Sequence, residues 1–197
     1  KWEEELNKKG RRSVTAVYFG TRHLISNREV KSRSDTSGMK IRNAPTKMWN
    51  EVSKTLGGNP TNTAWSEVYN ALSQGVADGA ESPLSLLYSA KLYEARKNIS
   101  LTGHLVATTS IVMSQKVYEG LPADAKAALD SVGRAYPSKR APKILAIEAD
   151  FRKKLEGEGV KFHDVDKTAF IEAAKDVSKA FPEWSPGLYD SMLKAIQ

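Results

Sequence analysis

One segment, residues 105–114, constrains the fold of this chain more than any other. It reads LVATTSIVMS, has the strongest strand character in the sequence, and is apolar enough to lie inside a sheet. A second strand-like segment, SVTAVYF at residues 13–19, is bounded by Gly10 and Gly20. We therefore expect a sheet that contains both segments.

Helical patterns separate the strand-like segments. Further strands are expected at residues 23–30, 39–43, 99–101 and 160–163. Helices are expected at residues 2–9, 45–56, 66–75, 84–90, 115–121, 123–136, 144–155, 168–181 and 187–196. Strands that alternate with helices in this way predict an α/β fold.

The longest helical region contains two prolines, Pro137 and Pro142. A proline has no amide hydrogen and its ring clashes with the preceding turn, so we expect the helix to kink or break at these residues. The segment 137–142 is also the best candidate for a linker between parts of the chain. The sequence leaves both interpretations open.

Residues 65–83 read WSEVYNALSQGVADGAESP and predict a short amphipathic helix followed by a tight, acidic turn. Ser66 is expected to cap the helix through its hydroxyl group. Two turn dipeptides, DG and SP, should hold Glu81 in an extended piece between two bends. The segment would thus present Trp65 at one end and Glu81 with Ser82 at the other.

Composition and charge exclude several kinds of site. The chain has no cysteine, which removes disulfides, thiol nucleophiles and cysteine-ligated metals. No apolar run approaches the roughly 20 residues that a membrane-spanning helix needs, and the sequence does not open with a basic and then apolar leader. The net charge of +7 favours anionic partners. The basic residues form small groups with acids nearby, so a solvated surface is a better interpretation of them than nucleic-acid binding.

The common motifs of catalysis and cofactor binding are missing from the sequence. There is no P-loop, no G-x-G-x-x-G, no H-E-x-x-H and no G-x-S-x-G. The three histidines, His23, His104 and His163, lack the helical spacing of metal ligands. We therefore expect no catalytic residue, no metal and no cofactor.

Arg42 is the residue that the sequence itself marks for ligand binding. It lies at the end of the expected strand 39–43, just before a helix that starts near Thr46. An arginine beside a helix N-terminus suits a carboxylate, because the guanidinium fork binds both oxygens and the helix dipole adds positive potential. The alternative is an arginine at a strand end that pairs with a nearby acid, and the residues alone favour that alternative.

Four motifs resemble those of the solute-binding proteins of tripartite ATP-independent periplasmic (TRAP) transporters, of the dicarboxylate- and sialic-acid-binding type. They are the segment 65–83, the K-I-R run that ends at Arg42, the G-T-R run that ends at Arg22, and the L-T-G-H run that ends at His104. An asparagine, Asn27, stands where the second of the family's arginine motifs places one. These motifs identify the chain as similar to this family.

The resemblance implies a binding site for a small carboxylate ligand. Arg42 would clamp the ligand carboxylate, and Trp65 would border the ligand. Arg22, Glu81 and His104 would form one polar cluster beside it, because a second buried positive charge is tolerated only when it is paired.

Ser82 is the residue at which this chain departs from the family. The family commonly has E-N-P where this chain has E-S-P at residues 81–83. Serine is shorter than asparagine and lacks its amide, so we expect Ser82 to contact the ligand differently and ligand specificity to differ with it.

The resemblance covers residues 11–197 and implies the type II-like, two-lobe fold of periplasmic solute-binding proteins. This chain would hold mainly the second lobe with the crossing segments, without the N-terminal part of the first lobe. Residues 1–20 would be a remnant of the first lobe, residues 21–122 the second lobe with its ligand-binding motifs, and residues 123–197 a kinked inter-lobe helix with C-terminal helices. An incomplete first lobe would favour an oligomer.

We therefore expect a periplasmic solute-binding subunit that is not an enzyme, binds a small organic acid and delivers it to the membrane subunits of a TRAP transporter. An enzyme that acts on an acidic substrate, with Glu81 and His104 as an acid–base pair, is the alternative from a second class. A basic module that binds nucleic acid is a third alternative.

Overall fold

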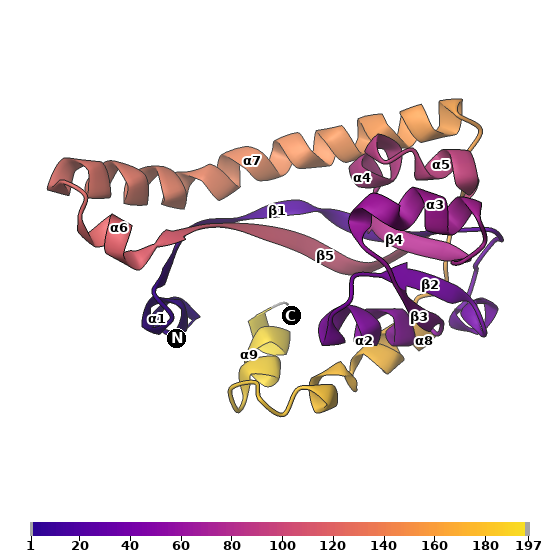
Figure 1. Ribbon diagram of the computed structural model, residues 1–197, viewed down its shortest axis with the longest axis horizontal. Coiled ribbons are helices and arrows are strands. Elements are labelled where there is room, and N and C mark those ends of the chain that lie inside the picture. Colours follow the sequence, from indigo (N-terminus) through magenta and orange to yellow (C-terminus); the bar gives the residue numbers. More distant parts are fainter. Residues whose placement is uncertain (1, 196–197) are drawn as a thin grey trace.

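The computed structural model describes residues 2–195, in which helices cover both faces of a six-stranded sheet (Figure 1). The strands are β1 (Arg11–Ser26), β2 (Lys40–Asn43), β3 (Asn59–Asn62), β4 (Gly79–Pro83), β5 (Asn98–Ser114) and β6 (Lys161–His163). The helices are α1 (Trp2–Lys8), α2 (Lys47–Thr55), α3 (Val68–Ser73), α4 (Leu84–Ser89), α5 (Leu92–Ala95), α6 (Gln115–Glu119), α7 (Ala123–Gly157), α8 (Thr168–Ala174) and α9 (Leu188–Ala195). The expected α/β class is confirmed.

The sheet is mixed and has the strand order β3-β2-β4-β1-β5-β6. Strands β2, β3 and β4 run parallel to one another, and β6 runs parallel to β5. Strand β1 is antiparallel to both of its neighbours, β4 and β5. The carboxyl ends of β2, β3 and β4 therefore lie at one edge of the sheet.

Successive residues of β1 show how the sheet divides two cores. Leu24 packs with Met39, Ile41 and Leu56 on the face that α2 and α8 cover. Its neighbour Ile25 faces the opposite way, since side chains alternate along a strand, and joins a larger cluster.

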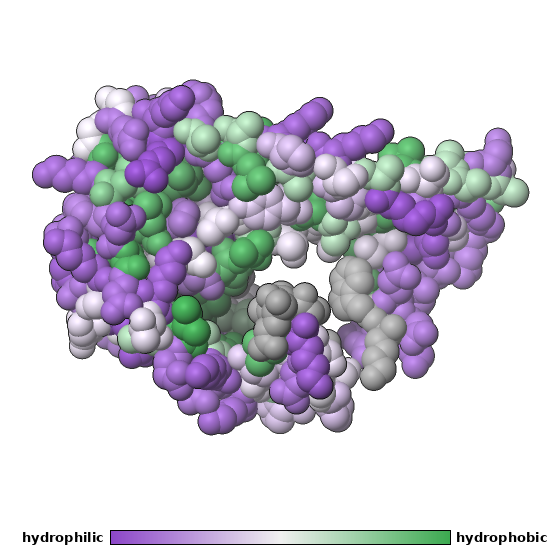
Figure 2. Space-filling model, turned by 180° about the vertical axis from the view of Figure 1, so that it is seen from behind, coloured by the Kyte–Doolittle hydropathy of each residue, from purple (hydrophilic) through white to green (hydrophobic). Residues whose placement is uncertain are grey.

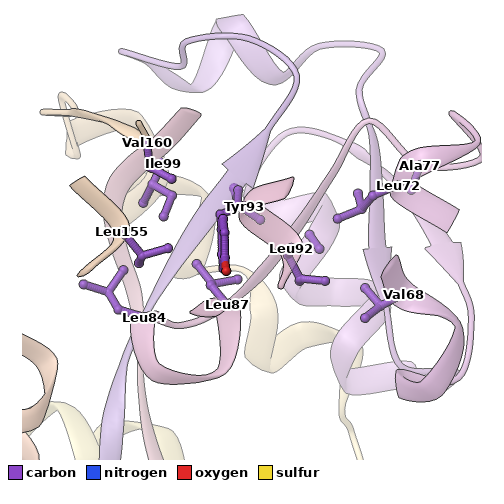
Figure 3. Packing of buried hydrophobic residues seen from close by; sticks show 12 residues of the cluster. Val68, Leu72, Ala77, Leu84, Leu87, Leu92, Tyr93, Ile99, Leu155 and Val160 are labelled. Carbon is purple, nitrogen blue, oxygen red and sulfur yellow. The ribbon is translucent and has the colours of Figure 1, made fainter. Parts of the chain in front are cut away.

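The larger cluster joins the sheet to α3, α4, α5 and the end of α7. Figure 3 shows Leu155 and Val160 beside Ile99 at one side of it and Val68 with Leu72 at the other. Burial of each such aliphatic side chain contributes about 1.5–3 kcal/mol. This cluster holds β4, which carries part of the candidate site, against its helices.

Strands β1 and β5 continue beyond the sheet as a long two-stranded ribbon (Figure 1). Only residues 22–26 of β1 also pair with β4, and only residues 98–100 of β5 also pair with β6. Two expected pairs of shorter strands, 13–19 with 23–30 and 99–101 with 105–114, thus merge into single strands with register shifts. The register shifts lie near the residues at which the sequence predicted that one strand would end and the next begin.

The prediction that residues 105–114 lie inside a sheet is wrong. Val106, Ile111 and Val112 of β5 are more than half exposed, at 63%, 51% and 51%. The segment has only β1 as a neighbouring strand and no strand on its other edge among the described residues. Figure 2 shows apolar residues spread among polar ones along this ribbon and along α7.

Helix α7 passes through both prolines without interruption, so the chain does not break at Pro137 and Pro142, and residues 137–142 are not a linker. The alternative, a kink in the helix, stays a prediction. Contacts with β1 hold this helix along much of its length. Asp130 accepts hydrogen bonds from Arg12 (3.0 Å) and Tyr118 (2.8 Å). Farther along, Glu148 accepts hydrogen bonds from the Tyr18 hydroxyl (2.5 Å) and the Thr21 amide (2.6 Å). These tertiary contacts offset the local cost of each proline, about 3 kcal/mol.

Several smaller expectations were also wrong. Strand β3 and helix α5 were not expected, and the helix expected at residues 168–181 is divided into α8 and a 3-10 turn at Val177–Ala180. Ser66 does not cap α3, which follows a 3-10 turn at Trp65–Glu67.

Thr46 does cap α2, by accepting a hydrogen bond from the Trp49 amide (3.3 Å). The end of the last expected helix, Ile196, lies outside the described residues.

The expected division into three segments stays a prediction. The boundary at residues 20 and 21 falls inside β1, and the boundary at residues 122 and 123 falls where α7 begins. Within residues 2–195, no helix is both long enough and apolar enough to cross a membrane.

Candidate functional site

A pocket of about 230 Å³ lies at the carboxyl ends of the parallel strands β2, β3 and β4. Each strand is followed there by a helical segment, and open α/β sheets commonly bind ligands at this edge. The described residues that line the pocket are Arg22, Arg42, Ala44, Pro45, Trp49, Ala64, Trp65, Glu81, Ser82 and Leu86. Five of the six expected site residues thus line one pocket, and the sixth, His104, lies behind Glu81.

Arg42 is the last residue but one of strand β2 and is 5% exposed. Its Nε donates to the Thr63 hydroxyl (3.2 Å), and its Nη2 donates to the Thr63 carbonyl (2.6 Å). Its Nη1 has no hydrogen-bond partner, and no acidic side chain forms an ion pair with it, among the residues that the structure describes. Thr63 therefore orients the guanidinium without neutralising its charge.

Arg22, by contrast, is paired. Its Nε and Nη2 both donate to the Glu81 carboxylate, the latter over 2.7 Å, and Nη2 also donates to the Glu81 carbonyl (3.0 Å). The guanidinium lies over the ring of Trp49, with its central carbon 4.5 Å from the ring centroid. Such a two-pronged pair with a stacked aromatic holds a guanidinium in one orientation.

His104 completes the polar cluster that the sequence predicted around Glu81. His104 Nε2 lies 3.2 Å from Glu81 Oε2, and Nδ1 lies 2.7 Å from Thr102 Oγ1. An ionised carboxylate can only accept hydrogen bonds, so Nε2 carries a proton, and in the neutral ring Nδ1 accepts from the Thr102 hydroxyl. His104 and Glu81 are both buried, with side-chain exposures of 5% and 2%.

The electrostatics of the cluster keep Glu81 ionised. Burial alone would raise the pKa of Glu81, but hydrogen bonds from Arg22 and His104, together with the charge of Arg22, lower it to about 2. A carboxylate that stays ionised near neutral pH is a poor proton donor. This arrangement argues against Glu81 as a general acid, and hydrogen bonds from Arg22 and His104 already occupy both oxygens that a general base would use.

Burial lowers the pKa of Arg42, the charge of Glu81 opposes that shift, and the charge of Arg22 adds to it. An arginine nevertheless stays protonated in proteins, so a buried positive charge without an ion-pair partner remains at the pocket. Trp65 flanks this charge, with its ring centroid 5.4 Å from the guanidinium carbon of Arg42.

Ser82 lines the pocket from the end of β4 and is fully buried. Its Oγ has no hydrogen-bond partner among the described residues. Most buried polar atoms in proteins are paired, so this hydroxyl is an exception that calls for a partner.

Trp49 is a wall residue that the sequence did not assign to the site, as are Ala64 and Leu86. The helix that carries it was expected, with Trp49 on its apolar face, but nothing assigned that side chain to the site. The start of α2 follows the carboxyl end of β2, and that position is the signal that points to Trp49.

The other two histidines lie elsewhere. His23 accepts a hydrogen bond from the Gly103 amide through Nδ1 (3.2 Å). In His163, Nε2 lies 3.0 Å from Asn98 Oδ1, and Nδ1 lies 2.8 Å from Glu29 Oε1. No group of three or more metal-binding side chains occurs among the described residues.

The chain matches the family of bacterial extracellular solute-binding proteins, family 7 (DctP), over residues 1–183. The sialic acid-binding periplasmic protein SiaP of Vibrio cholerae is 30% identical over 179 residues, which are 91% of this chain and 56% of SiaP. The chain therefore spans little more than half the length of this curated relative.

Solved structures agree with the sequence comparison. A TRAP periplasmic solute-binding protein from Ochrobacterium anthropi with bound L-fuconate has a TM-score of 0.88 and 34% identity, with 96% of this chain and 64% of that chain covered. A second, from Actinobacillus succinogenes with bound L-galactonate, has a TM-score of 0.89 and 30% identity, with 98% and 64% covered. These relatives are solute-binding proteins and not enzymes. The chain therefore belongs to the bacterial extracellular solute-binding proteins of family 7, the DctP family of TRAP solute-binding proteins.

Proposed function

We propose that this protein binds a small organic acid outside the cytoplasm, through an arginine clamp at Arg42, and delivers it to the membrane subunits of a TRAP transporter. The observation that carries the proposal is the buried guanidinium of Arg42, which lines the pocket and has no described ion-pair partner. A ligand carboxylate would neutralise this charge and take the free Nη1 group in a forked pair. Relatives named for sialic acid and structures with bound sugar acids support the same class of ligand.

The remaining site residues have distinct roles in this proposal. Arg22 and Glu81 neutralise each other, so they shape the wall without adding net charge, and His104 holds Glu81 from behind. Trp65 and Trp49 cover the two arginines with flat apolar surface. The proposal also includes a contact between the ligand and Ser82, which lines the pocket.

The test is Arg42→Ala, with isothermal titration calorimetry of N-acetylneuraminate, L-fuconate and L-galactonate as probes. Loss of a buried charged partner weakens binding by about 30-fold or more, so the variant should bind at least that much more weakly to whichever probe binds the parent protein. Arg42→Lys keeps the charge but loses the fork, and should fall between the two. Unchanged affinity in Arg42→Ala, with an unchanged circular dichroism spectrum, would refute the clamp.

A further inference from the structure

We propose that the protein has a second binding site, for a small zwitterion of the ω-amino acid type, in a cavity between α7, α4 and the ribbon of β1 and β5. This rear cavity has a volume of about 260 Å³. It lies where α7 passes over β1 beside α4 (Figure 1). The inference is independent of the pocket that Arg42 lines, which is the first pocket below.

The rear cavity and the first pocket lie on opposite faces of β1. Side chains alternate along a strand, and Arg22 lines the first pocket while its neighbours Thr21 and His23 line the rear cavity. No described residue lines both. A ligand in the rear cavity would therefore leave the first pocket free.

One end of the rear cavity offers hydrogen-bond donors and positive charge. His23 Nδ1 accepts from the Gly103 amide (3.2 Å), so Nε2 carries the proton of the neutral ring, and that group has no partner among the described residues. Arg152 donates through Nε to Glu156 (3.1 Å), and its two Nη groups have no described acceptor. Lys167 lies close by, since a side-chain carbon at Gly103 would meet its Nζ at 3.2 Å. These groups suit a carboxylate.

The titration of His23 agrees with a positive end. Burial, and after it the charges of His104, Lys167 and Arg152, lower the pKa of His23 to about 4. None of the charges that act on His23 in this way is negative. The carboxylate of Glu148 therefore does not offset the cations at this end.

Glu148 supplies a negative charge elsewhere in the rear cavity. Its Oε2 accepts from the Tyr18 hydroxyl (2.5 Å) and its Oε1 from the Thr21 amide (2.6 Å), and no described cation forms an ion pair with it. A carboxylate has about four acceptor positions, so two remain for an ammonium group of a ligand.

The spacing of the two charges suits a short chain with opposite charges at its ends. Glu148 and Arg152 are four residues apart in α7, about 6 Å along the helix, and no ion pair joins them among the described residues. The other walls include the apolar side chains of Leu84, Leu101 and Ala149. An ω-amino acid has methylene groups for these walls and a charge for each end.

The test is a titration of isotope-labelled protein with 4-aminobutanoate, butanoate and butylammonium, followed in two-dimensional NMR spectra. The zwitterion should bind at least about fivefold more tightly than either singly charged analogue, because it alone pairs with both ends. Its binding should shift the amide signals of Thr21 and Gly103. Equal binding of butanoate, or no saturable shift with the zwitterion, would overturn the inference.

Two arginine variants test the site itself. Arg152→Gln should weaken 4-aminobutanoate binding about fivefold, the size of one partly exposed ion pair, and leave butylammonium binding unchanged. Arg140→Gln is the matched control, because Arg140 lies in the same helix, has no described ion-pair partner and does not line the rear cavity. The same spectra show whether each variant is folded.

Two further outcomes would also overturn the inference. Equal losses in Arg152→Gln and Arg140→Gln would reduce the effect to the overall charge of the protein. Loss of 4-aminobutanoate binding in Arg42→Ala would place the zwitterion in the first pocket.

Discussion

Glu81 connects Arg22 and His104 beside the pocket. It pairs with Arg22 through two donors and with His104 through one, while being almost fully buried. Each of these groups depends on the same carboxylate for the compensation of its charge or polarity. The carboxylate is thus a structural counter-ion, and its removal leaves a buried guanidinium alone.

We expect Glu81→Gln to lower the free energy of unfolding by about 3–5 kcal/mol, because it breaks a buried pair on one side only. Urea denaturation followed by circular dichroism measures this change. Glu156→Gln removes a carboxylate from an exposed pair with Arg152 and should change stability by less than about 1 kcal/mol. Similar losses in the two variants would contradict the structural role of Glu81.

At the residue scale, the sequence predicted which polar side chains are in contact but not which of the charges are paired. Resemblance to family motifs placed Arg22, Glu81 and His104 in one cluster, and the structure brings them into hydrogen-bonding contact. The lone charge of Arg42 and the unpaired Ser82 hydroxyl depend on the neighbours of each atom, which no sequence spacing encodes.

Helix α7 lies against β1, and Gly133 faces the backbone of Val14. A side-chain carbon at Gly133 would collide with the backbone carbonyl oxygen of Val14. Val14 lies at a bulge of β1, between Ser13 and Thr15, which both pair with β5, so its backbone is held on either side. Gly133 therefore sets the distance between the long helix and the ribbon.

We expect Gly133→Ala to destabilise the protein by more than about 1 kcal/mol, although alanine favours helix by about that amount. Gly157→Ala in the same helix is the control, because a side-chain carbon there meets nothing within 4 Å, and it should stabilise the protein slightly. Thermal unfolding of the two variants should therefore shift in opposite directions. A stabilised Gly133→Ala protein would show that the helix does not rest on Val14.

On the scale of the whole molecule, two buried groups make stability depend on pH. Burial, followed by the charges of His104, Lys167 and Arg152, lowers the pKa of His23 from 6.5 to about 4. Hydrogen bonds and charge, acting against burial, lower the pKa of Glu81 from 4.5 to about 2. Both groups bind protons more weakly in the folded state than in the unfolded state, so acid favours unfolding.

The melting temperature should therefore fall as pH is lowered from about 6.5 to 4, through His23, and fall further toward pH 2, through Glu81. Differential scanning calorimetry from about pH 7.5 to about pH 2 covers both parts, because it spans the two pKa ranges. His23→Gln should flatten the first part and leave the second. A constant melting temperature between pH 6.5 and 4 would contradict the burial of a neutral His23.

The sequence by itself determined the α/β class, most helices and strands, and the family motifs, because these depend on local periodicity, capping and residue identity. Tertiary structure decided the rest. It merged paired short strands into the ribbon of β1 and β5, and it carried α7 through Pro137 and Pro142, since contacts with β1 outweigh the local cost of proline. It also gathered Arg22, Arg42, Glu81 and Ser82 at the carboxyl ends of parallel strands, because strand order depends on pairing between distant segments rather than on any one of them.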